Sequence, residues 1–278
     1  MNYIIVRRNM LAECFGAEVL RMYNGAIVVM TDPVVAPTHD LLDQITGQNV
    51  LIVGGYYRGK LSEFLAVAKS VTVFYNTSDT PDDVEHLILK ASPNRGFASY
   101  AVETANTENK ELLMKIAVWL DEYLYGFPSE NSLKFQNGVY TLDAKTDVEK
   151  VKLIMNGTWA IEDVLDVGAV KRHQNLVVAR ERLEEAREYT VLGKKVLVAI
   201  GGSPIVDSCI LLSQRTGIGM LVRYDQQKKR TFVSCRVTEA SGEDAGAIMH
   251  AFINGGGSRP MGGGSIDGIL SLDELFSR

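Results

Sequence analysis

Short apolar runs alternate with amphipathic stretches through the first half of the chain. Four runs have the length and the β-branched composition of buried strands, namely Tyr3–Val6, Ala26–Met30, Val50–Val53 and Val71–Phe74. The segments between them have helical spacing or composition, namely Met10–Tyr23, Thr38–Ile45 and Gly59–Lys69. This alternation of strand and helix predicts a parallel sheet with helices on both faces.

A helical pattern follows these alternating elements. Its segments are Asn109–Tyr125, Thr146–Met155 and Ala160–Asp166. A single long helix is predicted over Gly168–Arg187, because opposite charges recur three and four residues apart along one face. We interpret residues 168–190 as a connecting helix between a first domain, residues 1–167, and a second domain, residues 191–278.

The second domain begins with a new pattern of strands and helices. The predicted elements are the strand Lys195–Ile200, the helix Ile205–Thr216, the strands Gly219–Tyr224 and Thr231–Arg236, and the helix Gly242–Phe252. Gly201–Pro204 is predicted as a turn, although an anion can also bind before a helix in such a place. We therefore expect a parallel-sheet N-terminal domain and a smaller α/β C-terminal domain.

Composition and charge limit the function further. The 278 residues are 46% hydrophobic, and no apolar run has the length of a membrane span. Met1–Arg8 is predicted to form a strand and not a signal peptide. Three cysteines without metal-ligand spacing predict buried thiols in a reducing compartment, so we expect a cytoplasmic protein.

The charge is unevenly distributed along the chain. Residues 1–165 carry 14 Lys and Arg against 21 Asp and Glu, a net charge of −7, whereas residues 166–278 carry a net charge of +2. An acidic first half does not favour a nucleic acid, whose binding depends on the neutralisation of phosphates. It favours a basic partner.

Glycine-rich segments supply the candidate binding residues. Gly255–Gly264 is predicted as a loop whose backbone N–H groups approach a phosphate, with two arginines adding charge-assisted hydrogen bonds. Its candidate residues are Arg236, Gly255, Gly256, Gly257, Ser258 and Arg259. Weaker candidates follow the third strand or precede a helix, namely Gly54, Gly55, Arg58 and Arg95. The four histidines show no metal-ligand spacing, and neither a cofactor nor a catalytic residue is assigned.

The C-terminal motifs resemble those of the DHH/DHHA1 phosphoesterase family. Ser234-Cys-Arg236 matches a Ser-x-Arg strand, Gly255-Gly-Gly257 matches a Gly-Gly-Gly-His loop with Ser258 in place of the histidine, and Met261-Gly-Gly263 matches the element that follows. The resemblance implies that Arg236 and the loop hold the phosphate or the terminal nucleotide of a ligand. It also implies a homodimer.

The N-terminal half departs from the family pattern. Family members bind two divalent ions through aspartates and histidines at strand ends. The matching positions here hold Arg7-Arg8, Ala12-Glu13, Gly54-Gly55 and Tyr75-Asn76-Thr77, and one aspartate remains as Asp121. The resemblance therefore implies a degenerate member that has lost its metals.

Three functional hypotheses follow from these patterns. In the leading one, a catalytically inactive protein docks a basic segment of a partner, such as an RNA-binding region of an RNA-processing enzyme, and inhibits or modulates it. In the second, the C-terminal glycine loop binds a nucleotide, a cyclic dinucleotide or a short oligonucleotide. In the third, Glu13, Asp79 and Asp121 rebuild a metal site in an active phosphoesterase.

Overall fold

The computed structural model describes residues 3–8, 10–31, 37–54, 61–75, 88–90 and 96–277. The chain divides into two compact units, Met1–Gly168 and Ala169–Arg278. Within the described residues, no helix is both long enough and apolar enough to cross a membrane.

The first unit contains a parallel sheet, as the alternating pattern predicted. Its strands are β1 (Tyr3–Arg7), β2 (Ile27–Thr31), β3 (Asn49–Val53), β4 (Ser70–Tyr75) and β5 (Ile88–Lys90). Their spatial order is β2-β1-β3-β4-β5, and every neighbouring pair is parallel. The short strand β5 was not predicted from the sequence.

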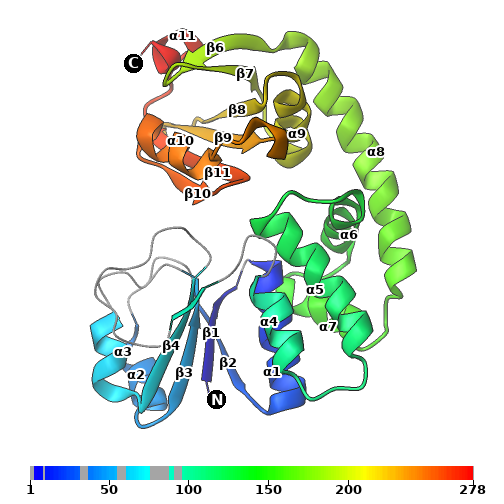
Figure 1. Cartoon of the computed structure of the whole chain (residues 1–278), viewed down its shortest axis with the longest axis vertical. Helices are drawn as coiled ribbons and strands as arrows, with labels where there is room; N and C mark the ends of the chain where they lie inside the picture. The colour runs from blue at the N-terminus through cyan, green and yellow to red at the C-terminus, as the bar shows by residue number, and fades with distance from the viewer. Residues whose placement is uncertain are drawn as a thin grey trace. The chain divides into compact units, whose positions relative to one another are not determined.

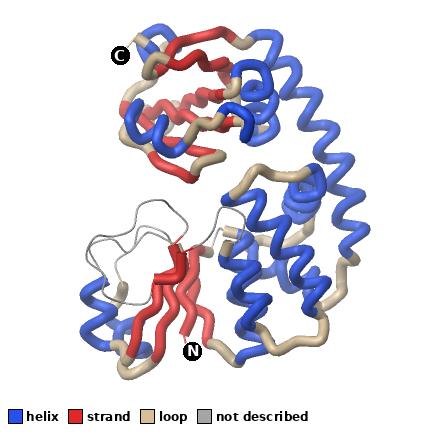
Figure 2. The backbone as a smooth tube through the Cα atoms, viewed as in Figure 1, coloured by secondary structure: helices blue, strands red, loops and turns tan. Residues whose placement is uncertain are grey.

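Helices cover both faces of this sheet (Figures 1 and 2). One face carries α1 (Leu11–Asn24) and α4 (Phe97–Thr104), and the other carries α2 (His39–Ile45) and α3 (Leu61–Val67). Along β1, Ile4 and Val6 enter the core under α1, whereas Ile5 enters the core under α2 and α3. This alternation holds the carboxyl end of β1 between two packed layers.

Helices complete the first unit, with two corrections to the sequence prediction. They are α5 (Lys110–Tyr125), α6 (Glu130–Thr141), α7 (Asp147–Met155) and the first part of α8 (Ile161–Glu185). Because α6 is rich in polar residues, its pattern did not predict a helix. The segments predicted at Ala160–Asp166 and Gly168–Arg187 form one continuous helix, α8, which ends at Glu185. The connecting helix predicted over residues 168–190 is therefore too long, because Arg187–Val191 pairs with the next strand as β6.

Glycines allow α6 and α8 to approach closely. A Cβ on Gly138 would lie 1.9 Å from the carbonyl oxygen of Val164, and a Cβ on Gly168 would lie 1.8 Å from that of Lys134. Neither position leaves room for a side chain, so close backbone packing adds to the burial of Leu133, Phe135 and Val139 in holding α6.

The second unit is built on a six-stranded mixed sheet. Its strands are β6 (Arg187–Val191), β7 (Lys194–Ile200), β8 (Ile218–Asp225), β9 (Arg230–Val237), β10 (Gly256–Ser258) and β11 (Met261–Asp267), in the order β10-β11-β9-β8-β7-β6. Only β7 and β8 among these pair in parallel. The helices are α9 (Ile205–Thr216), α10 (Ala245–Ile253) and α11 (Leu272–Phe276). A second α/β unit was predicted, and it is confirmed.

Candidate functional site

The strand order of the first sheet defines a natural ligand position. β2 and β3 lie on opposite sides of β1, so the order reverses between β1 and β3. In open parallel sheets, ligands bind outside the carboxyl ends of the strands at such a switch point. The residues at these ends are Arg7 and Gly54, and the first turn of α1 follows β1 closely in sequence.

A buried ion pair occupies this position. Glu13 lies in the first turn of α1 with its side chain 0% exposed, and it pairs with the guanidinium of Arg7. Nε of Arg7 lies 2.9 Å from Oε1 and 3.0 Å from Oε2 of Glu13, and Nη2 also donates to Oε1. The backbone N–H of Arg7 donates to Oε2 at 3.2 Å. The N-terminal end of α1 further favours a carboxylate in its first turn.

Gly54 makes room for this pair. Its φ is +94°, and a Cβ there would lie 3.0 Å from Nε of Arg7. The glycine, a weak binding candidate from sequence, therefore has a packing reason to lack a side chain. Gly55, Arg58 and Arg95 lie outside the described residues.

Asp121 is used as a helix cap. Its carboxylate is 1% exposed and accepts hydrogen bonds from the backbone N–H groups of Gly96 at 3.0 Å, Ala98 at 3.2 Å and Ser99 at 2.8 Å. These are the first amides of α4, whose own N-cap residue is a glycine without a side chain. Burial raises the pKa of Asp121 to about 6, while the hydrogen bonds oppose that rise.

The described residues do not fit a pair of divalent metal ions. Of the three carboxylates in the rebuilt-site hypothesis, Glu13 pairs with Arg7, Asp121 caps α4, and Asp79 lies outside the described residues. In the described part of the chain, no three His, Cys, Asp or Glu side chains gather in a metal-binding cluster. The Arg7–Glu13 pair is neutral, so it lacks the net negative charge that hard cations require.

The predicted glycine loop of the second unit is instead a β-hairpin. β10 pairs antiparallel with β11, and Gly256, Gly257 and Ser258 lie opposite Gly263, Gly262 and Met261. A Cβ on Gly262 would lie 2.5 Å from the carbonyl oxygen of Ala245 in α10. A Cβ on Gly257, whose φ is +153°, would lie 2.2 Å from that of Met261. These glycines allow α10 and the hairpin to pack. The loop prediction is wrong because a glycine-rich segment permits the close approach of another backbone as readily as that of a phosphate.

The hairpin brings three side chains into one row across β9, β11 and β10. Arg236 pairs with Met261, which pairs with Ser258. Arg236 is 5% exposed, and its Nη2 lies 3.3 Å from Sδ of Met261. The Oγ of Ser258 is buried and has no hydrogen-bond partner among the described residues. Arg259 lies exposed in the hairpin turn, and its carbonyl oxygen accepts from Ala245 N at 2.8 Å.

Arg182 fixes the turn between β7 and α9, a role that no sequence pattern indicated. Its Nη1 donates to the carbonyl oxygens of Gly202 at 3.0 Å and Pro204 at 3.1 Å, and its Nη2 donates to that of Ser203 at 2.7 Å. A Cβ on Gly201 would lie 2.5 Å from Nε of Arg182. This segment is therefore an ordered turn, as predicted.

The cysteines are inert thiols. All three are free and buried, as predicted. Burial raises the pKa of Cys14 and of Cys209 to about 12, and it also raises the pKa of Cys235. These raised pKa values disfavour a thiolate nucleophile at neutral pH.

Comparisons with known proteins identify the fold. No family model and no curated protein sequence matches the chain. Among solved structures, it resembles the pGpG-specific phosphodiesterase PggH from Vibrio cholerae, with a TM-score of 0.51 and 13% identity over 96% of this chain and 94% of that one. It also resembles an exopolyphosphatase-related protein from Bacteroides fragilis, with a TM-score of 0.54 and 10% identity over 97% and 88% of the two chains. The chain therefore has the two-domain architecture of the DHH/DHHA1 phosphoesterases.

Proposed function

We propose that this protein is a catalytically inactive representative of the phosphoesterase fold and that it acts by binding. The buried Arg7–Glu13 pair at the switch point between β1 and β3 carries the proposal. A phosphoesterase with two metals needs several carboxylates and imidazoles there, so that two divalent cations and a phosphate are held together. A neutral ion pair supplies neither the charge nor the open ligands.

The proposed partner is a basic protein segment, such as an RNA-binding region of an RNA-processing enzyme. Residues 1–165 carry a net charge of −7, which favours fast association with a basic surface that weakens as salt increases. Exposed acidic side chains of the first unit include Asp40, Asp43, Glu108, Glu111, Glu130, Asp143, Glu162, Asp163 and Asp166. Binding at such a surface would block the partner's access to RNA. A homodimer also stays a prediction.

Inactivity is tested by adding manganese chloride to the protein in a calorimeter and by measuring hydrolysis of pGpG and of polyphosphate with and without manganese. We expect neither saturable manganese binding nor hydrolysis above the buffer rate. Manganese-dependent turnover that disappears in a folded Glu13→Gln variant would contradict the proposal.

Partner binding is tested with an arginine-rich peptide as probe, over a series of salt concentrations. We expect the affinity to fall as salt rises, and to fall further in the variant Glu162→Lys/Asp163→Lys. The matched control is Glu181→Lys/Glu184→Lys, which makes the same charge change at exposed positions of α8 in the second unit. Equal losses of affinity in the two variants, or an affinity that does not change with salt concentration, would refute docking on the acidic unit.

A second candidate function is nucleotide binding by the hairpin of the second unit. It is favoured by the buried Oγ of Ser258, which has no hydrogen-bond partner among the described residues and lies in one row with Arg236. The similar protein PggH is named for its action on pGpG, so that dinucleotide is the first probe. Saturable pGpG binding that Ser258→Ala or Arg236→Ala abolishes in a folded protein would support this candidate, and no binding of pGpG to the parent protein would reject it.

A further inference from the structure

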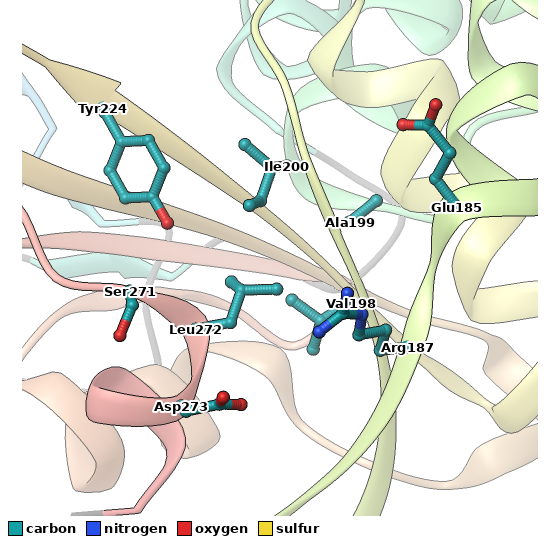
Figure 3. A pocket seen from close by; sticks show the side chains of 9 residues that line it. All are labelled: Glu185, Arg187, Val198, Ala199, Ile200, Tyr224, Ser271, Leu272 and Asp273. Atoms are coloured by element: carbon teal, nitrogen blue, oxygen red, sulfur yellow. The ribbon is translucent and has the colours of Figure 1, made fainter.

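We propose that a pocket in the second unit binds a small zwitterion with an apolar body, such as a free apolar or aromatic amino acid. The pocket has a volume of about 580 Å³ and lies among β7, β8, α11 and the start of β6 (Figure 3). Its size falls within the range of about 300–1,000 Å³ that is typical of small-molecule sites. The inference does not depend on the proposed function, because it concerns a different site.

The pocket lies where a parallel pair of strands ends. β7 and β8 pair in parallel, and Ile200, the last residue of β7, lies opposite Val222 of β8. On the face that carries Ile200, α10 packs against β9, β10 and β11, and α11 packs against β6. The carboxyl end of β7 is left partly open, and Ile200 is 47% exposed. Carboxyl ends of parallel strands are the usual place for ligands in α/β sheets.

The walls of the pocket suit an apolar group. Val198 and Ile200 come from β7, and Leu272 comes from α11. In Figure 3, Leu272 and Ile200 project toward the same space, and the ring of Tyr224 stands beside them. A ligand side chain that covered Ile200 would remove apolar surface from water, which is the main driving force for binding in such sites.

Charges of both signs accompany the apolar walls. Arg187 of β6 supplies a guanidinium, which prefers a carboxylate or another planar anion. Asp273 of α11 supplies a carboxylate whose Oδ1 accepts a hydrogen bond from the hydroxyl of Tyr189 at 3.1 Å. The side chain of Glu185 also lines the pocket, but its carboxylate points away from the other side chains in Figure 3. A ligand that carries both a carboxylate and an ammonium group satisfies Arg187 and Asp273 together.

The test uses three related probes: L-phenylalanine, 2-phenylethylamine, which lacks the carboxylate, and 3-phenylpropanoate, which lacks the ammonium group. Binding to the full chain is followed by the NMR signal of the Ile200 methyl groups and by ligand-observed NMR. We expect L-phenylalanine to bind with a Kd of about 1 mM or tighter. Each analogue is expected to bind about tenfold more weakly, because a charged hydrogen bond is lost.

Variants assign each charge to its partner. Arg187→Gln is expected to weaken the binding of L-phenylalanine and of 3-phenylpropanoate about tenfold and to leave the binding of 2-phenylethylamine unchanged. Asp273→Asn is expected to weaken the binding of L-phenylalanine and of 2-phenylethylamine about tenfold and to leave that of 3-phenylpropanoate unchanged. Ile200→Glu should abolish binding, whereas Leu192→Glu, at a position of the same unit that is 55% exposed, should not. Absence of a saturable Ile200 shift with all three probes, or equal loss in the Ile200 and Leu192 variants, would overturn the proposal.

Discussion

Replacement of Arg7 by leucine should destabilise the first unit strongly. The change removes the guanidinium that balances the carboxylate of Glu13, whose side chain is 0% exposed. Breaking one side of a buried ion pair costs about 3–5 kcal/mol, because the remaining charge has been taken out of water. For a unit of this size, that loss lowers the melting temperature by roughly 6–20 °C.

Replacement of both partners by leucine should restore most of the stability. An apolar pair of similar volume carries no desolvation cost, so the double variant is expected within about 1 kcal/mol of the parent protein.

Tryptophan fluorescence during urea unfolding measures these changes in the first unit alone. The chain has two tryptophans, Trp119 and Trp159, and both lie in the first unit. A loss below about 1 kcal/mol for Arg7→Leu would place this pair among ordinary surface ion pairs. It would refute both the burial argument and the proposal that this pair takes the place of metal ligands at the end of β1.

Three further predictions concern single positions. Because burial raises the folded pKa of Asp121 to about 6, above the value near 3.9 of an unfolded chain, stability should fall by up to about 3 kcal/mol as the pH rises from about 4 through 6. In urea unfolding, an Asp121→Asn variant should lack this part of the pH dependence of stability. A pH dependence identical to that of the parent protein would contradict this assignment to Asp121. Gly262→Ala should cost about 1–3 kcal/mol, since its Cβ would meet Ala245 O at 2.5 Å, whereas Gly256→Ala, with open space around it, should cost far less by thermal unfolding. Ser258→Ala should leave the melting temperature unchanged or raise it, because it removes a buried hydroxyl that has no hydrogen-bond partner in the described part of the chain, and a clear drop would reveal a bond to Oγ.

Local patterns were sufficient to predict the core strands of both units. β1 and β3 contain continuous apolar runs that are buried on both faces of the sheet, which is the signature of a parallel sheet. β5 has three residues and α6 lacks a clear apolar stripe, so neither produced a pattern of sufficient length. Gly138 and Gly168 allow α6 to pack closely against α8, but this role is recognisable only once the two helices are known to be neighbours in space.

The site was harder to predict because its interacting residues come from different secondary-structure elements. The sequence shows Arg7-Arg8 where the family resemblance leads one to expect a metal ligand, and Glu13 was considered only as a ligand of a rebuilt metal site. Their pairing was not predicted, although a strand ending in arginine before an acidic first helical turn holds that signal. The cap that Asp121 provides to α4 spans more than twenty residues and left no local signal.

The helix α8 has a consequence for any attempt to separate the two units. It runs without interruption from Ile161 to Glu185, and the boundary between the units falls inside it, after Gly168. A polypeptide that ended there would lose the hydrogen-bonding partners of its last helical turn, and one that began there would start without a cap. Unfolding of either unit would leave that unit's part of the helix without its packing surface, so we expect the two units to share part of their cooperativity through a single continuous backbone.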